Sequence, residues 1–165
     1  MVSSNLFRTL GYAGLLPFSF GLLMMMFELT VLGITGITLF TSYSAIILSF
    51  LSGALWGRVI HLSEESFERP TILVFSNLFA LLAWLGLLAG QGYITLWILL
   101  IGYLLVITVE HACLNTSEDS GGTVPQLASK PSEPPSMSGY AKMRIYLTGI
   151  VASLHVLGIA VWSAS

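Results

Sequence analysis

Residues 38–60 read TLFTSYSAIILSFLSGALWGRVI, and this stretch decides the fold. It is long enough to cross the hydrocarbon core of a bilayer, which takes about 20 mostly apolar residues. Its single charge, Arg58, stands close to one end, and its apolar side chains surround the helix instead of forming one stripe. A helix that is apolar on every side is typical of a lipid environment. The stretch therefore predicts a transmembrane helix.

Four further stretches have the same character and predict further spans, at residues 10–27, 71–89, 93–109 and 145–163. The composition agrees, because 8% of the residues are charged, whereas a typical soluble domain has about 25%. We therefore expect an all-α fold, one transmembrane domain over residues 1–165 built as a bundle of five helices. The first run is too long for the apolar part of a signal peptide, so we expect it to be retained. Pro17 is expected to kink it.

The connections between the spans differ in kind. Residues 29–37 form a short uncharged link, and Gly90-Gln91-Gly92 predicts a tight turn that makes the third and fourth spans an antiparallel hairpin. Residues 112–139 are rich in Ser, Pro and Gly and have few large apolar side chains. Such a segment cannot bury enough surface to fold, so it is expected to be a disordered cytoplasmic loop.

The distribution of basic residues predicts the orientation. With five spans, every Lys and Arg falls on one side of the membrane: Arg8, Arg58, Arg69, Lys130, Lys142 and Arg144. The positive-inside rule then places the N-terminus in the cytoplasm and the C-terminus outside. The expected location is the bacterial inner membrane; in a mitochondrion the same side would face the matrix.

The second span carries a row of small residues. Ala45, Ser49, Gly53 and Gly57 recur every fourth residue and share one face of the helix. Rows of this kind let two helices approach closely in lipid. The first interpretation is packing against another helix of the same chain; a dimer face or a narrow polar path are the alternatives. Trp56 belongs to the same segment, and its role is left open.

Two ionisable groups near the ends of spans raise the question of an ion pair. Arg58 lies about one turn inside the end of the second span, where a long basic side chain can reach the interface. The sharper hypothesis pairs it with Glu110, at the same-side end of the fourth span. Arg144, at the start of the fifth span, is a rival partner for that carboxylate. A bidentate pair would tie helix ends together.

His155 is the one ionisable side chain well inside a span, which makes it a candidate functional residue. A neutral imidazole that is hydrogen-bonded to another helix is the structural interpretation, and a proton, metal or ligand role is the alternative. Asn77 is expected to form a hydrogen bond across helices. Tyrosines and tryptophans, several of them at predicted span ends, indicate interfacial belts: Tyr12, Tyr43, Tyr93, Trp97, Tyr103, Tyr140, Tyr146 and Trp162.

Several classes of function find no support in the sequence. There is no basic stripe for nucleic acid, and no phosphate-binding, dinucleotide-binding or hydrolase motif, so no cofactor is expected. The chain has one cysteine, Cys113, and therefore no internal disulfide. Glu110, His111, Cys113 and His61 imitate a metal site, but their spacing matches no recognised ligand set, so no metal is expected.

Residues 11–18 read GYAGLLPF, residues 43–57 read YSAIILSFLSGALWG, and residues 143–148 read MRIYLT. These three blocks resemble the DUF3429 family, which also covers the animal mitochondrial transmembrane protein 69. By this resemblance, positions that match the family are Ser49, Gly53, Trp56, Gly57, Arg144 and Thr148. The chain departs from the pattern at Ser52, where family members typically have glycine, and at Leu55, where a histidine is common. The family has no assigned activity, so the resemblance implies a membrane fold and no reaction.

Three functions follow as hypotheses. The favoured one is a non-catalytic accessory, assembly or structural membrane protein, with the lipid bilayer around it and a membrane protein or a second copy as its partner. The second is a small oligomeric transporter or channel, with Ser49, Ser52, Asn77 and His155 lining a route and Arg58 at its mouth. The third and weakest is a membrane enzyme using Glu110, His111 and His61 at the cytoplasmic face. The sequence leans against an enzyme because no nucleophile and base can be paired.

Overall fold

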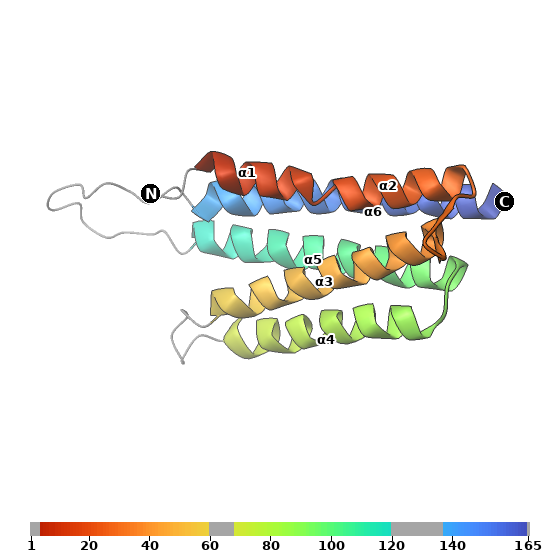
Figure 1. The fold of residues 1–165 in the computed structure, drawn as a ribbon. Helices are drawn as coiled ribbons and strands as arrows, with labels where there is room; N and C mark the ends of the chain where they lie inside the picture. The colour runs from red at the N-terminus through yellow and green to blue at the C-terminus, as the bar shows by residue number, and fades with distance from the viewer. Residues whose placement is uncertain (1–3, 60–67, 120–136, 165) are drawn as a thin grey trace, which may run out of the picture.

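The computed structural model describes residues 4–59, 68–119 and 137–164. Its helices run side by side along one axis, and the two chain ends lie toward opposite ends of that axis (Figure 1). The elements in chain order are α1 (Ser4–Ala13), α2 (Leu16–Met26), β1 (Thr30–Val31), β2 (Ile34–Thr35), α3 (Gly36–Val59), α4 (Glu68–Leu88), α5 (Tyr93–Asp119) and α6 (Met137–Ala164).

Within the described residues, five helical stretches are long and apolar enough to cross a membrane, which confirms the predicted fold class. They are Thr9–Met26, Gly36–Gly57, Pro70–Leu88, Tyr93–Ala112 and Lys142–Ala164. At one end of the bundle α1, α4 and α6 begin while α3 and α5 end (Figure 1). We call it the charged end, since the basic residues of the described helices lie near these termini. The opposite end, with β1 and β2, is the hairpin end. The chain is an integral membrane protein.

The first span is broken into two helices where a kink was predicted. The chain leaves α1 after Ala13, and Pro17 occupies the first turn of α2, a position that needs no internal N–H partner. The Tyr43 hydroxyl on α3 donates a hydrogen bond of 3.0 Å to the Gly14 carbonyl oxygen. A backbone acceptor within the break is thereby satisfied by a neighbouring helix, as a break inside a membrane requires.

The link after α2 is more regular than the sequence predicted. Thr30–Val31 pairs antiparallel with Ile34–Thr35, and Leu32 and Gly33 form the turn with positive φ angles of 52° and 79°. Two consecutive positive φ angles are typical of a type I′ hairpin turn. The prediction missed these strands because each has only two residues and Leu32-Gly33 is not a common turn sequence.

The long segment predicted as a loop is shorter than expected. Helix α5 continues through Asp119 and α6 already begins at Met137, so the prediction of a loop over 112–139 is wrong at both ends. The remaining residues of that segment, 120–136, lie outside the described residues. Polar residues at the end of a span can prolong a helix beyond the membrane because the backbone hydrogen bonds continue there.

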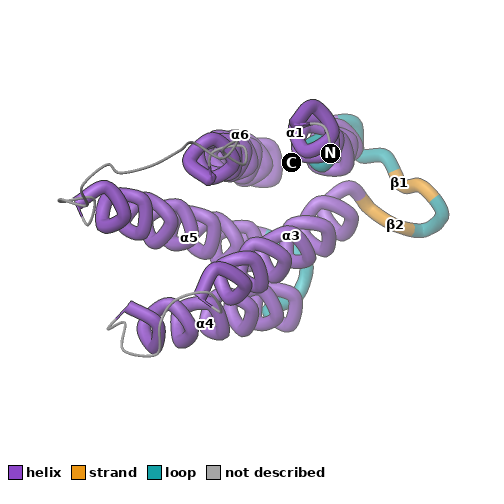
Figure 2. The backbone as a smooth tube through the Cα atoms, turned by 90° about the vertical axis from the view of Figure 1, so that its left-hand side faces the viewer, coloured by secondary structure: helices purple, strands orange, loops and turns teal. Residues whose placement is uncertain are grey.

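Helix α3 occupies the central position of the bundle. It packs against α4, α2 and α5, while α6 packs against α5 and α2. Viewed along the axis from the charged end, α3 lies between α4 and the layer formed by α1 and α6 (Figure 2). The core fills the space with large apolar side chains from α2, α3, α4, α5 and α6, among them Phe18, Phe40, Leu48, Leu99 and Val106.

Candidate functional site

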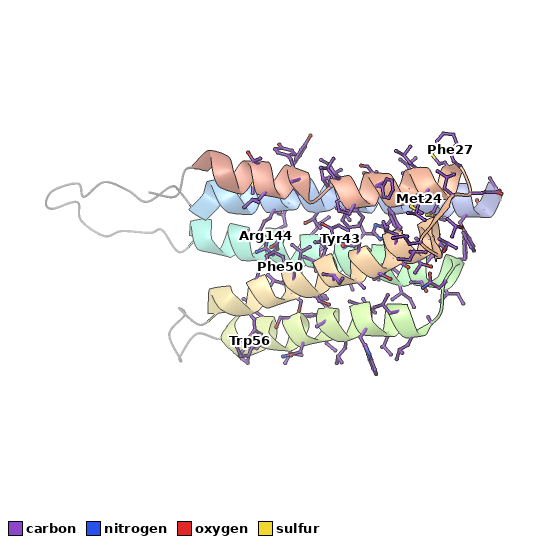
Figure 3. The ribbon with its side chains drawn as sticks, in the orientation of Figure 1. Met24, Phe27, Tyr43, Phe50, Trp56 and Arg144 are labelled. Carbon is purple, nitrogen blue, oxygen red and sulfur yellow. The ribbon has the colours of Figure 1, made fainter. Side chains whose placement is uncertain are left out.

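An ion pair is buried toward the charged end of the bundle. Nη2 of Arg144 on α6 lies 2.7 Å from Oε1 of Glu110 on α5. The same nitrogen donates a hydrogen bond of 3.3 Å to the carbonyl oxygen of Leu51 on α3. Arg144 is 7% exposed and Glu110 is 1% exposed. One guanidinium therefore links α6, α5 and α3; Arg144 is labelled in Figure 3.

The rival partner proposed from the sequence is thus the one that the structure brings to Glu110. A charge-assisted pair of this kind is strong and geometrically specific. It is also costly to break, since loss of one partner leaves an uncompensated charge away from water. The side chain of Arg58 lies outside the described residues, so its interfacial position and its pairing with Glu110 stay predictions.

A second polar cluster lies deeper, around His155 on α6. Its Nε2 is 2.7 Å from Oγ of Ser44 on α3, and its Nδ1 is 2.8 Å from the Val151 carbonyl oxygen. A carbonyl oxygen only accepts, so Nδ1 carries a hydrogen and the Ser44 hydroxyl can donate to Nε2. The Tyr103 hydroxyl on α5 donates to the Ser44 carbonyl oxygen at 2.8 Å. Both ring nitrogens have partners, as the structural interpretation of this histidine requires.

Aromatic rings enclose the imidazole. The ring centroids of Phe40, Tyr103 and Phe18 lie 4.9, 5.0 and 6.1 Å from that of His155. The exposed fraction of His155 is 0%. Ser44 and His155 have the spacing of a nucleophile and its base, but both are sealed inside the core. The cluster is suited to joining α3, α5 and α6.

Three of the four small residues of α3 do not pack inside the bundle, contrary to the first interpretation of the sequence. Ala45 is 2% exposed, but Ser49, Gly53 and Gly57 lie on the exposed surface. A Cβ atom added at Gly53 or Gly57 would meet nothing within 4 Å. The face was misjudged because, in a span that is apolar on all sides, hydrophobicity does not distinguish the buried from the lipid-facing side.

Two aromatic side chains flank these small residues. Phe50 is 65% exposed and Trp56 is 48% exposed, and both lie on α3 (Figure 3). In this part of the helix the exposed positions are 46, 49, 50, 53, 56 and 57. At about 3.6 residues per turn, Gly53 falls in the middle of them, with Phe50 and Trp56 to either side. We call this surface, formed by Ser49, Phe50, Gly53, Trp56 and Gly57, the outward face of α3.

The predicted hydrogen bond of Asn77 across helices is wrong. Its side chain is exposed, and its Nδ2 donates at 3.0 Å to the Leu73 carbonyl oxygen of its own helix. Ser52 makes the contact between helices instead, donating to the Ser76 carbonyl oxygen on α4. Since Ser49 and Asn77 face outward while His155 is sealed, these residues do not line a common route.

The residues considered for an enzyme are not assembled by the described structure. His61 lies outside the described residues. His111 is exposed, whereas its neighbour Glu110 is buried and paired with Arg144. Within residues 4–59, 68–119 and 137–164, no three His, Cys, Asp or Glu side chains lie close enough together to hold a metal ion.

The sequence analysis missed several residues that make hydrogen bonds between helices. Tyr103 and Tyr43 were assigned to interfacial belts, yet Tyr103 is fully buried beside His155 and Tyr43 bonds to the break in the first span. For Tyr103 a signal existed, because it lies in the middle of its span, far from either interface. For Ser44 no signal existed, since one serine among several in α3 does not reveal which helix it faces.

The comparison with known proteins identifies the family. Residues 4–160 match the family described as "Protein of unknown function (DUF3429)", which covers nearly the whole chain. No curated protein and no solved structure matches. The match extends from α1 into the last turns of α6, so it includes the ion pair, the His155 cluster and the outward face of α3. The chain belongs to the DUF3429 family.

Proposed function

We propose that this protein is a non-catalytic accessory or assembly factor that holds a transmembrane helix of another membrane protein against the outward face of α3. The observation that carries the proposal is the position of Gly53 and Gly57, where an added Cβ would meet nothing within 4 Å. These two glycines and Ser49 are spaced four residues apart, so the outward face of α3 carries a row of exposed small residues.

The free-energy cost of glycine in a helix favours a second helix as the occupant of the outward face of α3. Glycine in a helix interior costs about 1 kcal/mol relative to alanine, and the bundle gains no close helix contact from it here. That cost is offset when the backbone of a second helix packs closely against the small residues. Phe50 and Trp56 would then form the walls of the contact, and aromatic side chains contribute strongly to binding at interfaces.

The interior supports a structural role. The Arg144–Glu110 pair and the His155 cluster each join three helices with partners that are buried. Ser44, Ser52, Thr148 and His155 are all less than 5% exposed. Side chains that hold helices together in this way give a rigid platform for presenting α3.

The location proposed for the protein is the bacterial inner membrane, with the charged end of the bundle in the cytoplasm. The support is the arrangement of the basic residues: Arg8 lies in α1, Arg58 in the last turn of α3, Arg69 in the first turn of α4, and Lys142 and Arg144 near the start of α6. An excess of Lys and Arg marks the cytoplasmic side of a membrane protein.

Site-specific photocrosslinking in native membranes tests the proposal. A benzophenone side chain replaces Phe50 in one variant and Leu81 in the matched control, since Leu81 is 52% exposed on α4. The expected result is a discrete adduct from position 50 that contains a second membrane protein, and no such adduct from position 81. Lipid adducts alone at both positions, or the same adduct from both, would overturn the proposal. An adduct of two copies of this chain would replace the accessory role with self-association.

A further inference from the structure

The hairpin formed by β1 and β2 leaves the bundle sideways. Viewed along the helix axis, it projects away from α2 and α3 instead of folding over the end of the bundle (Figure 2). Along the axis it lies level with the end of α2, and the end of α6 reaches further out (Figure 1). The hairpin therefore lies beside the helix ends, at the depth where the spans leave the membrane.

The hairpin exposes several large apolar side chains, with Thr30 and Thr35 as its exposed polar ones. Leu29 is 52%, Val31 46%, Leu32 96% and Ile34 44% exposed. Glu28, just before the hairpin, is the only charged residue between Arg8 and Arg58. A nearly fully exposed leucine at the tip of an uncharged hairpin is unfavourable in water, because apolar surface gains free energy by leaving it.

The backbone conformation of the turn also bears on why a leucine lies at the tip. Leu32 has a φ of 52°, a left-handed conformation that favours glycine, asparagine or aspartate. A polar asparagine would suit both this backbone and an aqueous tip. Leucine suits neither the left-handed backbone nor water. We therefore expect an apolar environment around its side chain to offset the free-energy cost of this conformation.

The hairpin also stands away from the bundle on its inner side. A pocket of about 270 Å³ lies behind it, with Leu29, Thr30 and Thr35 on one wall and Val161 and Trp162 of α6 on another. Trp162 is 38% exposed near the end of α6, and tryptophan side chains are enriched where spans meet the membrane interface. Val31, Leu32 and Ile34 do not line this pocket.

We propose that the hairpin is a membrane-dipping element: Leu32, Val31 and Ile34 insert into the lipid at the hairpin end, between headgroups and acyl chains. The occupant of this surface is lipid, because the hairpin extends within the plane where the surrounding medium is lipid and carries no charge that would oppose insertion. The interface still contains water, which satisfies the backbone groups of the turn that the two-residue strands leave unpaired. Glu28 limits the depth, since its carboxylate stays among the headgroups. The element fixes the vertical position of the α2–α3 connection.

Spin-label accessibility in lipid nanodiscs tests this. In a Cys113→Ser background, single nitroxides are placed at Leu32→Cys and, independently, at Ile34→Cys. Gln91→Cys, in the polar turn between α4 and α5 at the same end, is the aqueous control. Val156→Cys, 55% exposed within α6, is the lipid control. Power saturation is measured with oxygen, which concentrates in lipid, and with a nickel chelate, which stays in water.

The expected result is that the labels at 32 and 34 respond to oxygen more than to nickel, as at position 156, and opposite to position 91. A nickel response equal to that at position 91 would show an aqueous hairpin and overturn the proposal. Protection from both reagents would also overturn it, since that outcome places a protein partner on the hairpin. Because Leu32 is 96% exposed, the substitution removes no packing contact, and the label at 34 checks the result at a second site.

Discussion

Arg144 on α6 and Glu110 on α5 meet through a 2.7 Å contact between Nη2 and Oε1, at a place where neither side chain is more than 8% exposed. They lie in helices joined by the segment 120–136, which the structure does not describe. The contact therefore holds α5 to α6 independently of that connection. Through Leu51 it also reaches α3.

Removal of one partner of this pair should destabilise the protein more than removal of both. Glu110→Gln leaves a buried guanidinium without its counter-charge, and the expected loss is about 3 kcal/mol or more. The double variant Glu110→Gln with Arg144→Met should recover much of that loss. Unfolding free energies in detergent for the two single variants and the double variant measure the coupling. Strictly additive losses would show that the two side chains do not depend on each other.

The hydrogen bond between Ser44 and His155 should stabilise the folded protein. Ser44→Ala removes the donor to Nε2 and leaves a buried acceptor without it, so a loss of about 1 kcal/mol is expected. Ser153→Ala is the matched control, because Ser153 is exposed and its hydroxyl bonds only to the Gly149 carbonyl oxygen of its own helix. Thermal unfolding in nanodiscs compares the two variants. Equal effects would contradict a specific role for the Ser44 contact.

Gly36 and Gly53 should respond in opposite ways to alanine. A Cβ at Gly36 would clash with the Met25 backbone nitrogen, so Gly36→Ala forces α2 and α3 apart and should lower the melting temperature strongly. Gly53→Ala meets nothing within 4 Å and replaces glycine by a better helix former, so stability should hold or rise by about 1 kcal/mol. A marked loss of stability in Gly53→Ala would mean that the outward face of α3 packs within the monomer.

Glu28 ends α2 in a left-handed conformation, with φ of 52°. The Leu29 N–H bonds to the Met24 carbonyl oxygen at 2.9 Å and the Glu28 N–H to that of Met25 at 3.3 Å, the pattern of a Schellman cap. Glu28→Gly should therefore stabilise the fold by about 1 kcal/mol, because non-glycine residues are strained there. Glu28→Gln keeps the Cβ and removes the charge; a gain equal to that of Glu28→Gly would attribute the effect to charge.

The orientation can be tested with the single native cysteine. Cys113 follows the fourth span at the charged end, so an impermeant maleimide should label it in inverted membrane vesicles and not in right-side-out cells. Gln91→Cys in a Cys113→Ser background should show the opposite pattern. Labelling of Cys113 from outside intact cells would reverse the proposed orientation.

The sequence was a good guide to which residues form spans and a poor guide to which side of each span faces inward. Long apolar stretches such as residues 93–109 predict spans because only a helix satisfies its own backbone in lipid. Lateral orientation carries no such signal, since core and lipid are equally apolar. This is why Gly53 and Gly57 were assigned to intramolecular packing and lie on the surface instead.

The ion-pair and hydrogen-bond partners of polar side chains were predictable only where few candidate partners lay at the same depth. Glu110 had two proposed partners near the correct depth, and Arg144 is the one found beside it. Asn77 was expected to reach another helix, but an amide can also bond to the carbonyl four residues earlier, as it does with Leu73. The partners of His155 depend on helix arrangement, which no single sequence specifies.

The outward face of α3 is tested most directly by native mass spectrometry of the protein purified from its own membrane in nanodiscs, with Gly53→Leu as the comparison. Wild type should retain a second membrane protein at fixed stoichiometry. Gly53→Leu should lose it while remaining folded, because a Cβ at Gly53 meets nothing within 4 Å and the larger side chain would occupy the position of the approaching helix. A wild-type protein found as a lone monomer, or a complex that Gly53→Leu leaves unchanged, would contradict partner binding at this face.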